Sequence, residues 1–84
     1  MPEEVVGRVS KYFAKPMVAA VSLSAGPVRL GDRLRFKGHT TDFEMEVSSI
    51  QEEHQSLEEA VSGQMVGLKV TERVREGDQV FLIS

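Results

Sequence analysis

Glycine and proline divide most of this sequence into short runs, and this spacing restricts the possible fold more than any other feature. The breaks fall at Gly7, Pro16, Gly26-Pro27, Gly31, Gly38, Gly63, Gly67 and Gly77. The runs between them are rich in Val, Leu, Phe and Ile, and no long window repeats apolar residues at helical spacing. Short runs of this kind between turn residues are typical of an all-β domain.

Six main strands are predicted, at about 5–12, 17–24, 32–38, 42–52, 64–71 and 79–83. The second contains MVAAV, which is apolar on both faces and is expected to be buried. The segment 53–62 is predicted to be a polar connection with room for one helical turn. Because no helix is available to cover a sheet, the strands predict a closed or nearly closed barrel, which removes exposed edges. A chain of 84 residues is expected to form a single domain, residues 1–84.

The third and fourth predicted strands fit one hairpin register. Residues pair when their numbers sum to 81, which gives Lys37–Glu44, Arg35–Glu46, Phe36–Met45 and Leu34–Val47. One register then satisfies both the charged face and the apolar face. The basic strip of Arg33, Arg35 and Lys37 is either a track for phosphates or one side of a salt-bridge ladder, and this pairing favours the ladder.

One kind of turn occurs twice. Val28-Arg29-Leu30-Gly31-Asp32 is similar to Val74-Arg75-Glu76-Gly77-Asp78, and each places Gly-Asp immediately before a predicted strand. Glycine supplies a positive-φ position without steric cost, and the aspartate can cap the turn with its side chain. We interpret the similarity as the same turn used twice.

The reactive residues do not form a pattern typical of catalysis. The chain has no cysteine, and its two histidines, His39 and His54, have no second histidine at metal-ligand spacing. Glu52-Glu53 and Glu58-Glu59 are adjacent pairs, and neighbours in a strand point to opposite faces. The sequence therefore predicts neither an enzyme nor a bound cofactor or metal.

Charge is distributed unevenly along the chain. The net charge is −3, but residues 1–40 carry seven basic and three acidic groups (+4), and residues 41–84 carry three basic and ten acidic groups (−7). Such a split can produce a two-faced molecule, whereas interleaved halves would neutralise each other, and for a barrel we expect interleaving. No apolar run approaches about 18 residues and no signal peptide is recognisable, so a cytoplasmic protein without a membrane anchor is expected.

Two sets of residues carry a resemblance to known domains. The first is Val9, Val18 to Val21, Gly26, Val28, Gly31-Asp32, Leu34 and Phe36, and the second is Val47, Ile50, Ala60, Gly63, Val66-Gly67-Leu68, Val74, Gly77-Asp78 and Val80. Over about residues 8–83 the chain resembles the β-barrel second domain of translational GTPases, of the elongation factor Tu type. It is also similar to the C-terminal module of the collagenase-like peptidase family. The first resemblance implies an all-β, closed six-stranded Greek-key barrel, translation-factor domain 2-like.

The resemblance to translational GTPases also implies contact with RNA, the ribosome or the aminoacyl end of tRNA, beside a GTPase domain. This chain has no G-x-x-x-x-G-K-[ST] phosphate loop, so it is not expected to bind GTP by itself. Gln51 and His54 stand where the tRNA-binding member of the family carries an acidic residue and an arginine. Recognition of aminoacyl-tRNA is therefore not expected.

The candidate binding residues lie in two loops and on one strand. In Lys11-Tyr12-Phe13-Ala14-Lys15 the rings could stack a base beside its phosphate, or one ring could fill the end of the barrel. The polar loop 38–42 either contacts a partner or serves only to form a turn. The predicted RNA- or partner-binding residues are Lys11, Tyr12, Phe13, Lys15, Arg33, Arg35, Lys37, His39 and Thr40.

Two functions are compatible with these observations. The leading hypothesis is a stand-alone, non-catalytic module that binds RNA or a ribonucleoprotein such as the ribosome. The alternative is a protein-interaction domain that docks onto a separately encoded enzyme, or forms an oligomer, through the acidic region 44–59.

Overall fold

The chain forms strands in nearly all the segments where apolar and polar residues alternate. The computed structural model describes residues 3–83, which contain ten β-strands and no helix. The strands are β1 (Glu3–Phe13), β2 (Val18–Leu23), β3 (Val28–Arg29), β4 (Arg33–Lys37), β5 (Asp42–Glu46), β6 (Ile50–Glu52), β7 (Gln55–Leu57), β8 (Glu59–Ala60), β9 (Met65–Lys69) and β10 (Gln79–Ile83). The prediction of an all-β fold is therefore confirmed.

The strands differ from the prediction in the middle of the chain. The predicted strand 42–52 is divided into β5 and β6, and the polar segment 53–62 contains β7 and β8 instead of a helical turn. The additional strands β3 and β8 pair with each other over only two residues each. Strands this short show no alternation of side chains in the sequence, so periodicity does not detect them.

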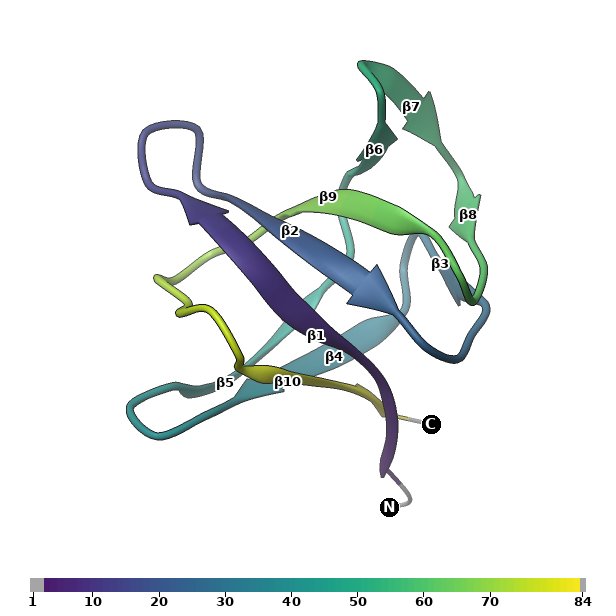
Figure 1. Ribbon diagram of the computed structural model, residues 1–84. Helices are drawn as coiled ribbons and strands as arrows, with labels where there is room; N and C mark the ends of the chain where they lie inside the picture. Colours follow the sequence, from purple (N-terminus) through teal and green to yellow (C-terminus); the bar gives the residue numbers. More distant parts are fainter. Residues whose placement is uncertain (1–2, 84) are drawn as a thin grey trace.

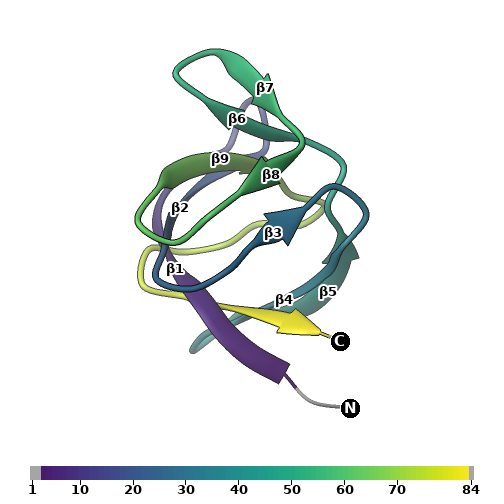
Figure 2. The same ribbon diagram turned by 90° about the vertical axis from the view of Figure 1, so that its right-hand side faces the viewer.

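Eight strands form one antiparallel sheet that curls around the core, and β3 and β8 form a small second sheet (Figures 1 and 2). The strand order of the large sheet is β5-β4-β10-β1-β2-β9-β6-β7. The predicted closure of the barrel is not supported, because β5 and β7 stand at the two ends of this order and are not paired within residues 3–83. After β5 the chain bonds to a turn instead: the N–H of Val47 donates to the carbonyl of Asp32 at 2.8 Å.

The core lies inside the curl of the large sheet. Inward-facing residues alternate with outward-facing ones along β2, β4, β5 and β9, as a half-buried strand requires. Phe36 and Phe43 stack at the centre of the β4–β5 hairpin, with ring centroids 5.2 Å apart. The side chains of largest volume that are fully buried include Phe36, Leu34, Ile50 and Leu68. The hydrophobic interior that they form holds the outer faces of the strands in place.

The predicted register of the β4–β5 hairpin was wrong by two residues. Paired residues sum to 79 and not to 81, so Arg35 faces Glu44 and Phe36 faces Phe43. A four-residue turn causes the difference, since the N–H of Gly38 donates to the carbonyl of Thr41 at 2.8 Å. A shift of two residues leaves every side chain on the predicted face, because the side chains of a strand repeat with a period of two.

The predicted repeated turn is confirmed, and the structure adds a third copy. In the two predicted copies the aspartate carboxylate accepts the N–H three residues earlier, from Arg29 to Asp32 and from Arg75 to Asp78, each at 2.8 Å. In the third copy the side-chain oxygen of Gln64 accepts the N–H of Val61 at 2.7 Å. The glycine before the capping residue has φ +91° in all three copies, at Gly31, Gly63 and Gly77.

No segment within residues 3–83 folds into a helix long and apolar enough to cross a membrane.

Candidate binding surface

The predicted basic strip lies on the outer face of β4 and β5, here called the β4–β5 wall. Arg33 donates to Glu44 at 3.1 Å, and Arg35 donates to both carboxylate oxygens of Asp42 at 3.0 and 3.1 Å. These partners are diagonal to the arginines and not directly opposite, so the individual ion pairs differ from those predicted. The interpretation as a salt-bridge ladder is nevertheless confirmed for Arg33 and Arg35, and these pairs weaken the attraction of the wall for phosphate.

Arg35 is held from two sides. Besides Asp42 on β5, it donates to Glu3 on β1 at 3.1 Å. The hydrogen bonds that Arg35 donates to Asp42 and, to a lesser extent, to Glu3 raise the pKa of Arg35 above its ordinary value. The guanidinium therefore links β1 to the β4–β5 hairpin.

The aromatic pair at the end of β1 divides between core and solvent. Tyr12 is half-buried and packs against the core, whereas Phe13 is 43% exposed. The ammonium group of Lys11 lies 5.3 Å from the centroid of the Phe13 ring, which is a cation–π distance. Lys15 is exposed in the turn between β1 and β2. One predicted ring therefore serves the fold, and the other remains accessible beside two lysines.

His39 and Thr40 are exposed at the tip of the β4–β5 turn. Thr41, in the same turn, is buried and supplies the carbonyl that closes it. Because β10 lies between β4 and β1 in the sheet, the predicted residues fall on separate walls of the molecule and do not form one site. Within residues 3–83 no three His, Cys, Asp or Glu side chains are grouped in a way that could hold a metal ion.

A second basic surface lies on the outer faces of β1, β2 and β9, here called the β1–β2–β9 wall. The register aligns its outward residues in three rows, Arg8–Ser22–Met65, Lys11–Ala20–Gly67 and Phe13–Val18–Lys69. The segments 5–13, 18–24 and 65–69 contain no Asp or Glu. Within residues 3–83, Arg8, Lys11 and Lys69 make no ion pair, so the positive charge of this wall remains unneutralised.

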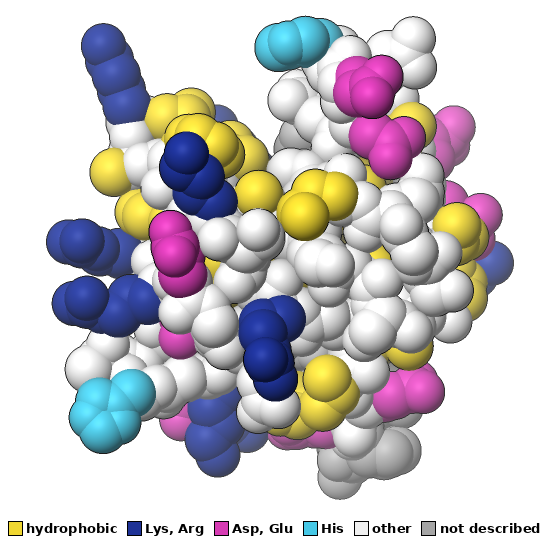
Figure 3. Space-filling view, viewed as in Figure 1, with side chains coloured by type: hydrophobic (Ala, Val, Ile, Leu, Met, Phe, Trp, Pro, Cys, Tyr) yellow, Lys and Arg dark blue, Asp and Glu magenta, His cyan; other side chains and the backbone are white. Residues whose placement is uncertain are grey.

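Acidic and basic side chains are therefore interleaved on only part of the surface. Opposite charges alternate on the β4–β5 wall, as expected, but not on the β1–β2–β9 wall. In Figure 3 dark blue side chains gather at the left of the molecule and magenta ones at its upper right. The expectation of interleaving fails here because β1 pairs with β2, and β2 pairs in turn with β9, whose only charged residue is Lys69, and not with an acidic strand.

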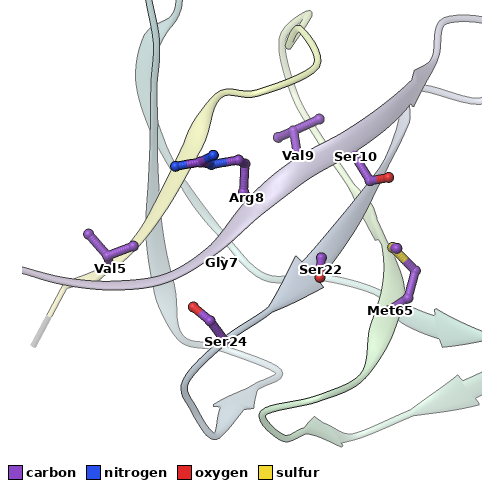
Figure 4. A pocket seen from close by; sticks show the side chains of 8 residues that line it. All are labelled: Val5, Gly7, Arg8, Val9, Ser10, Ser22, Ser24 and Met65. Atoms are coloured by element: carbon purple, nitrogen blue, oxygen red, sulfur yellow. The ribbon is translucent and has the colours of Figure 1, made fainter.

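A hollow of about 530 Å³ lies on the β1–β2–β9 wall (Figure 4). Its lining residues are Val5, Gly7, Arg8, Val9, Ser10, Ser22, Ser24 and Met65. Sequence reasoning missed this site, because MVAAV was expected to be buried on both faces, whereas Val18 and Ala20 face outward and are only half-buried. The signal that could have revealed it is three predicted strands, about 5–12, 17–24 and 64–71, without any acidic residue.

Both the sequence and the structure of this chain are similar to those of known proteins. No family model matches the chain. It is 38% identical over 79 residues to an uncharacterized protease of Methanocaldococcus jannaschii, covering 93% of this chain and 19% of that protein. It is 34% identical over 77 residues to a collagenase of Porphyromonas gingivalis, covering 90% of this chain and 21% of the collagenase. The chain thus spans about a fifth of the length of the curated relatives that it matches.

Two solved structures share the fold. Both are of the C-terminal domain of a Geobacillus thermoleovorans protein assigned to the U32 peptidases. The selenomethionine variant has a TM-score of 0.85 and 25% identity, and it covers 92% of this chain and 96% of that domain. The other structure has a TM-score of 0.88 and 24% identity, and the match covers 96% of this chain and 93% of that domain. The chain is therefore similar to the C-terminal domain of the U32 peptidase and collagenase family, and the comparisons do not show the resemblance to translational GTPases.

Proposed function

We propose that this chain is a non-catalytic accessory domain that docks onto a peptidase-like catalytic domain. The observation that carries the proposal is the match with a peptidase C-terminal domain over 92% of this chain and 96% of that domain. The curated relatives with protease and collagenase names are about five times longer, and the matching fifth leaves ample length for a separate catalytic domain.

The positions of the histidines support a non-catalytic role. His39 lies at the tip of the β4–β5 turn and His54 at the tip of the β6–β7 turn, and both are exposed. In Figure 3 the two cyan histidine side chains lie far apart, at the top and at the lower left of the molecule. The two imidazole groups are therefore not arranged to act on one substrate, because acid–base catalysis requires groups within hydrogen-bond reach of the same reacting atoms.

The β1–β2–β9 wall is the surface best suited to dock a partner. Its cations are not neutralised within the domain, so a partner with acidic groups can pair with them. It also carries exposed apolar side chains, namely Val5 at 43%, Phe13 at 43% and Met65 at 50% exposure. Apolar contacts supply most of the binding free energy at protein interfaces, and complementary charge orients the partners.

The experiment is co-purification of the tagged chain from its own host, with and without nuclease treatment. We expect a peptidase-like protein to be recovered under both conditions, and the two purified proteins to form a complex in size-exclusion chromatography. Recovery of RNA or ribosomal proteins that are lost on nuclease treatment would contradict the proposal and favour the RNA hypothesis, which the comparisons do not support.

Matched variants identify the surface. The double substitution Lys11→Gln and Lys69→Gln removes two cations from the β1–β2–β9 wall, and Arg33→Gln with Lys37→Gln removes two from the β4–β5 wall. We expect the first pair of substitutions to weaken the complex and the second pair to leave its affinity unchanged. Equal weakening by both would mean that net charge, and not this wall, governs association.

A further inference from the structure

We propose that the hollow on the β1–β2–β9 wall is a carboxylate-binding subsite, and that its occupant is an acidic side chain flanked by apolar residues on an extended segment of the catalytic domain. This inference rests on the proposed accessory function and adds the chemistry that the docked segment must have. Three properties of the hollow carry it: its charge, its apolar margins and the local backbone.

The charge of the hollow is concentrated in one side chain. Arg8 is the only charged residue among those that line it, and within residues 3–83 Arg8 makes no ion pair. A guanidinium group presents a planar fork of donors that matches the two oxygens of a carboxylate. The remaining polar side chains are the hydroxyls of Ser10, Ser22 and Ser24, which can donate to further lone pairs of the same group.

The margins of the hollow are apolar. Val5 and Met65 lie on opposite sides of it, with Arg8 and the serines between them (Figure 4). Their side chains are 43% and 50% exposed, although both are large hydrophobic residues. A docked segment would gain by covering them, so the residues on either side of its acidic side chain should be apolar.

Two β-bulges in β1 create this arrangement. The register shifts between Val5 and Gly7 against β10, and again between Val9 and Lys11 against β2. The first shift buries both Val6 and Gly7, so that Val5 and Arg8 face outward although they are three residues apart. The second shift turns Ser10 and Lys11 outward together. Bulges re-aim side chains in this way, and they are enriched beside functional sites.

Gly7 is required for this backbone path. A Cβ atom at Gly7 would lie 2.6 Å from the carbonyl oxygen of Ser22 and 3.1 Å from a methyl carbon of Val21. β1 and β2 therefore approach each other more closely at the hollow than a side chain would permit. The hollow is thus a defined part of the backbone fold and not only a gap between flexible side chains.

The hollow suits a protein segment better than a nucleic acid. Binding of single-stranded nucleic acid depends on aromatic rings that stack bases and on cations spaced along a backbone. Of residues 3–83, no aromatic residue lines the hollow, and Arg8 is the single cation that does. Phe13 is in the row of Val18 and Lys69, two rows away from Arg8.

The test uses two synthetic probes, the capped peptides acetyl-Ala-Leu-Glu-Leu-Ala-amide and its Gln analogue, titrated into the isotope-labelled chain at low salt. We expect the Glu peptide to shift the amide NMR signals of Gly7, Arg8, Ser22 and Ser24 in a saturable manner. We expect the Gln peptide to bind at least about fivefold more weakly, which corresponds to ~1 kcal/mol. In Arg8→Gln the preference for Glu should disappear, in Met65→Ser both peptides should weaken equally, and Arg33→Gln should change nothing.

Three results would overturn the proposal: no saturable shift at these amides, equal binding of the two peptides, or an unchanged preference in Arg8→Gln. Stronger shifts of the same amides by a uridine oligonucleotide than by the Glu peptide would also overturn it. The proposed function is tested separately, by co-purification. If the peptidase-like protein still binds Arg8→Gln with full affinity, the subsite is wrong and the accessory role stands; if no such protein is recovered, the accessory role itself fails.

Discussion

At the scale of single residues, Gly38 leaves no room for a side chain beside the carboxylate of Asp78. A Cβ atom there would overlap Oδ1 of Asp78 and lie 2.6 Å from its Cγ. Asp78 is buried at 5% exposure, so its carboxylate cannot move aside into solvent. We expect Gly38→Ala to lower the free energy of unfolding by about 3 kcal/mol, as overpacking of a rigid site does, measured by urea denaturation.

Gly31→Ala is the control for Gly38. Gly31 has φ +91°, and a Cβ atom there would meet nothing within 4 Å. Only the strain of the left-handed conformation is expected, about 1 kcal/mol. Equal losses of stability in the two variants would show that the approach of Asp78 to Gly38 is not the decisive contact.

The tip of the β6–β7 hairpin should be open to stabilisation. Glu53 and His54 have φ 49° and 68°, so both residues of this two-residue turn are in the left-handed region that Asn and Gly tolerate best. Both side chains are exposed, and within residues 3–83 neither makes an ion pair. We expect the double variant Glu53→Asn and His54→Gly to raise the free energy of unfolding by about 1 kcal/mol. A lower midpoint in thermal unfolding would contradict this.

At the scale of elements, removal of the capping side chain should lower the free energy of unfolding by different amounts in different copies of the repeated turn. Removing the carboxylate of Asp78 leaves the N–H of Arg75 without its acceptor in a part-buried turn. We expect Asp78→Ala to cost about 1–3 kcal/mol. In Asp32→Ala water can replace the acceptor for Arg29, since that turn is exposed, and the cost should stay below about 1 kcal/mol. Denaturant midpoints of the two variants provide the comparison, and a larger loss in Asp32→Ala would refute the argument.

The same elements show which features of the fold can be predicted from the sequence and which cannot. Alternation assigned the inner and outer faces of β4 and β5 correctly, because the direction of a side chain in a strand is a local property. The predicted register was wrong because alternation does not give the length of the turn, which a hydrogen bond from Gly38 to Thr41 closes over four residues. The third turn escaped detection because Gln64 takes the place of the aspartate.

The binding surface was less predictable than the fold, because it depends on which distant strands become neighbours. The sequence favoured a salt-bridge ladder for the basic strip, but the carboxylates that pair with Arg33 and Arg35 are those of Glu44 and Asp42, and not the predicted partners. The sequence did not indicate Arg8 as a binding residue, because simple alternation through β1 gives no sign of the two bulges in this strand. The ion pairs follow from the register of one hairpin, and the unneutralised wall around Arg8 follows from the pairing of β2 with the distant strand β9, neither of which local patterns encode.

At the scale of the whole molecule, one interior should produce one unfolding transition. The core includes residues from nearly every strand, and its buried members form a single cluster. The chain has one tyrosine and no tryptophan, so the fluorescence of half-buried Tyr12 reports on the end of β1 alone. We expect its unfolding curve to coincide with that of far-ultraviolet circular dichroism, which averages over all strands. Separate midpoints would indicate that the β1 end unfolds independently of the rest.

The β6–β7 hairpin stands away from the rest of the sheet in both ribbon views (Figures 1 and 2). Its tip is exposed, and its connection to the body is reinforced where the amide of Gln64 donates to Glu52 at 3.3 Å. Projecting loop tips of this kind accept inserted sequence with little damage to a fold. A fluorophore or purification handle grafted between Glu53 and His54 would therefore follow the domain into its complexes while leaving the β1–β2–β9 wall uncovered.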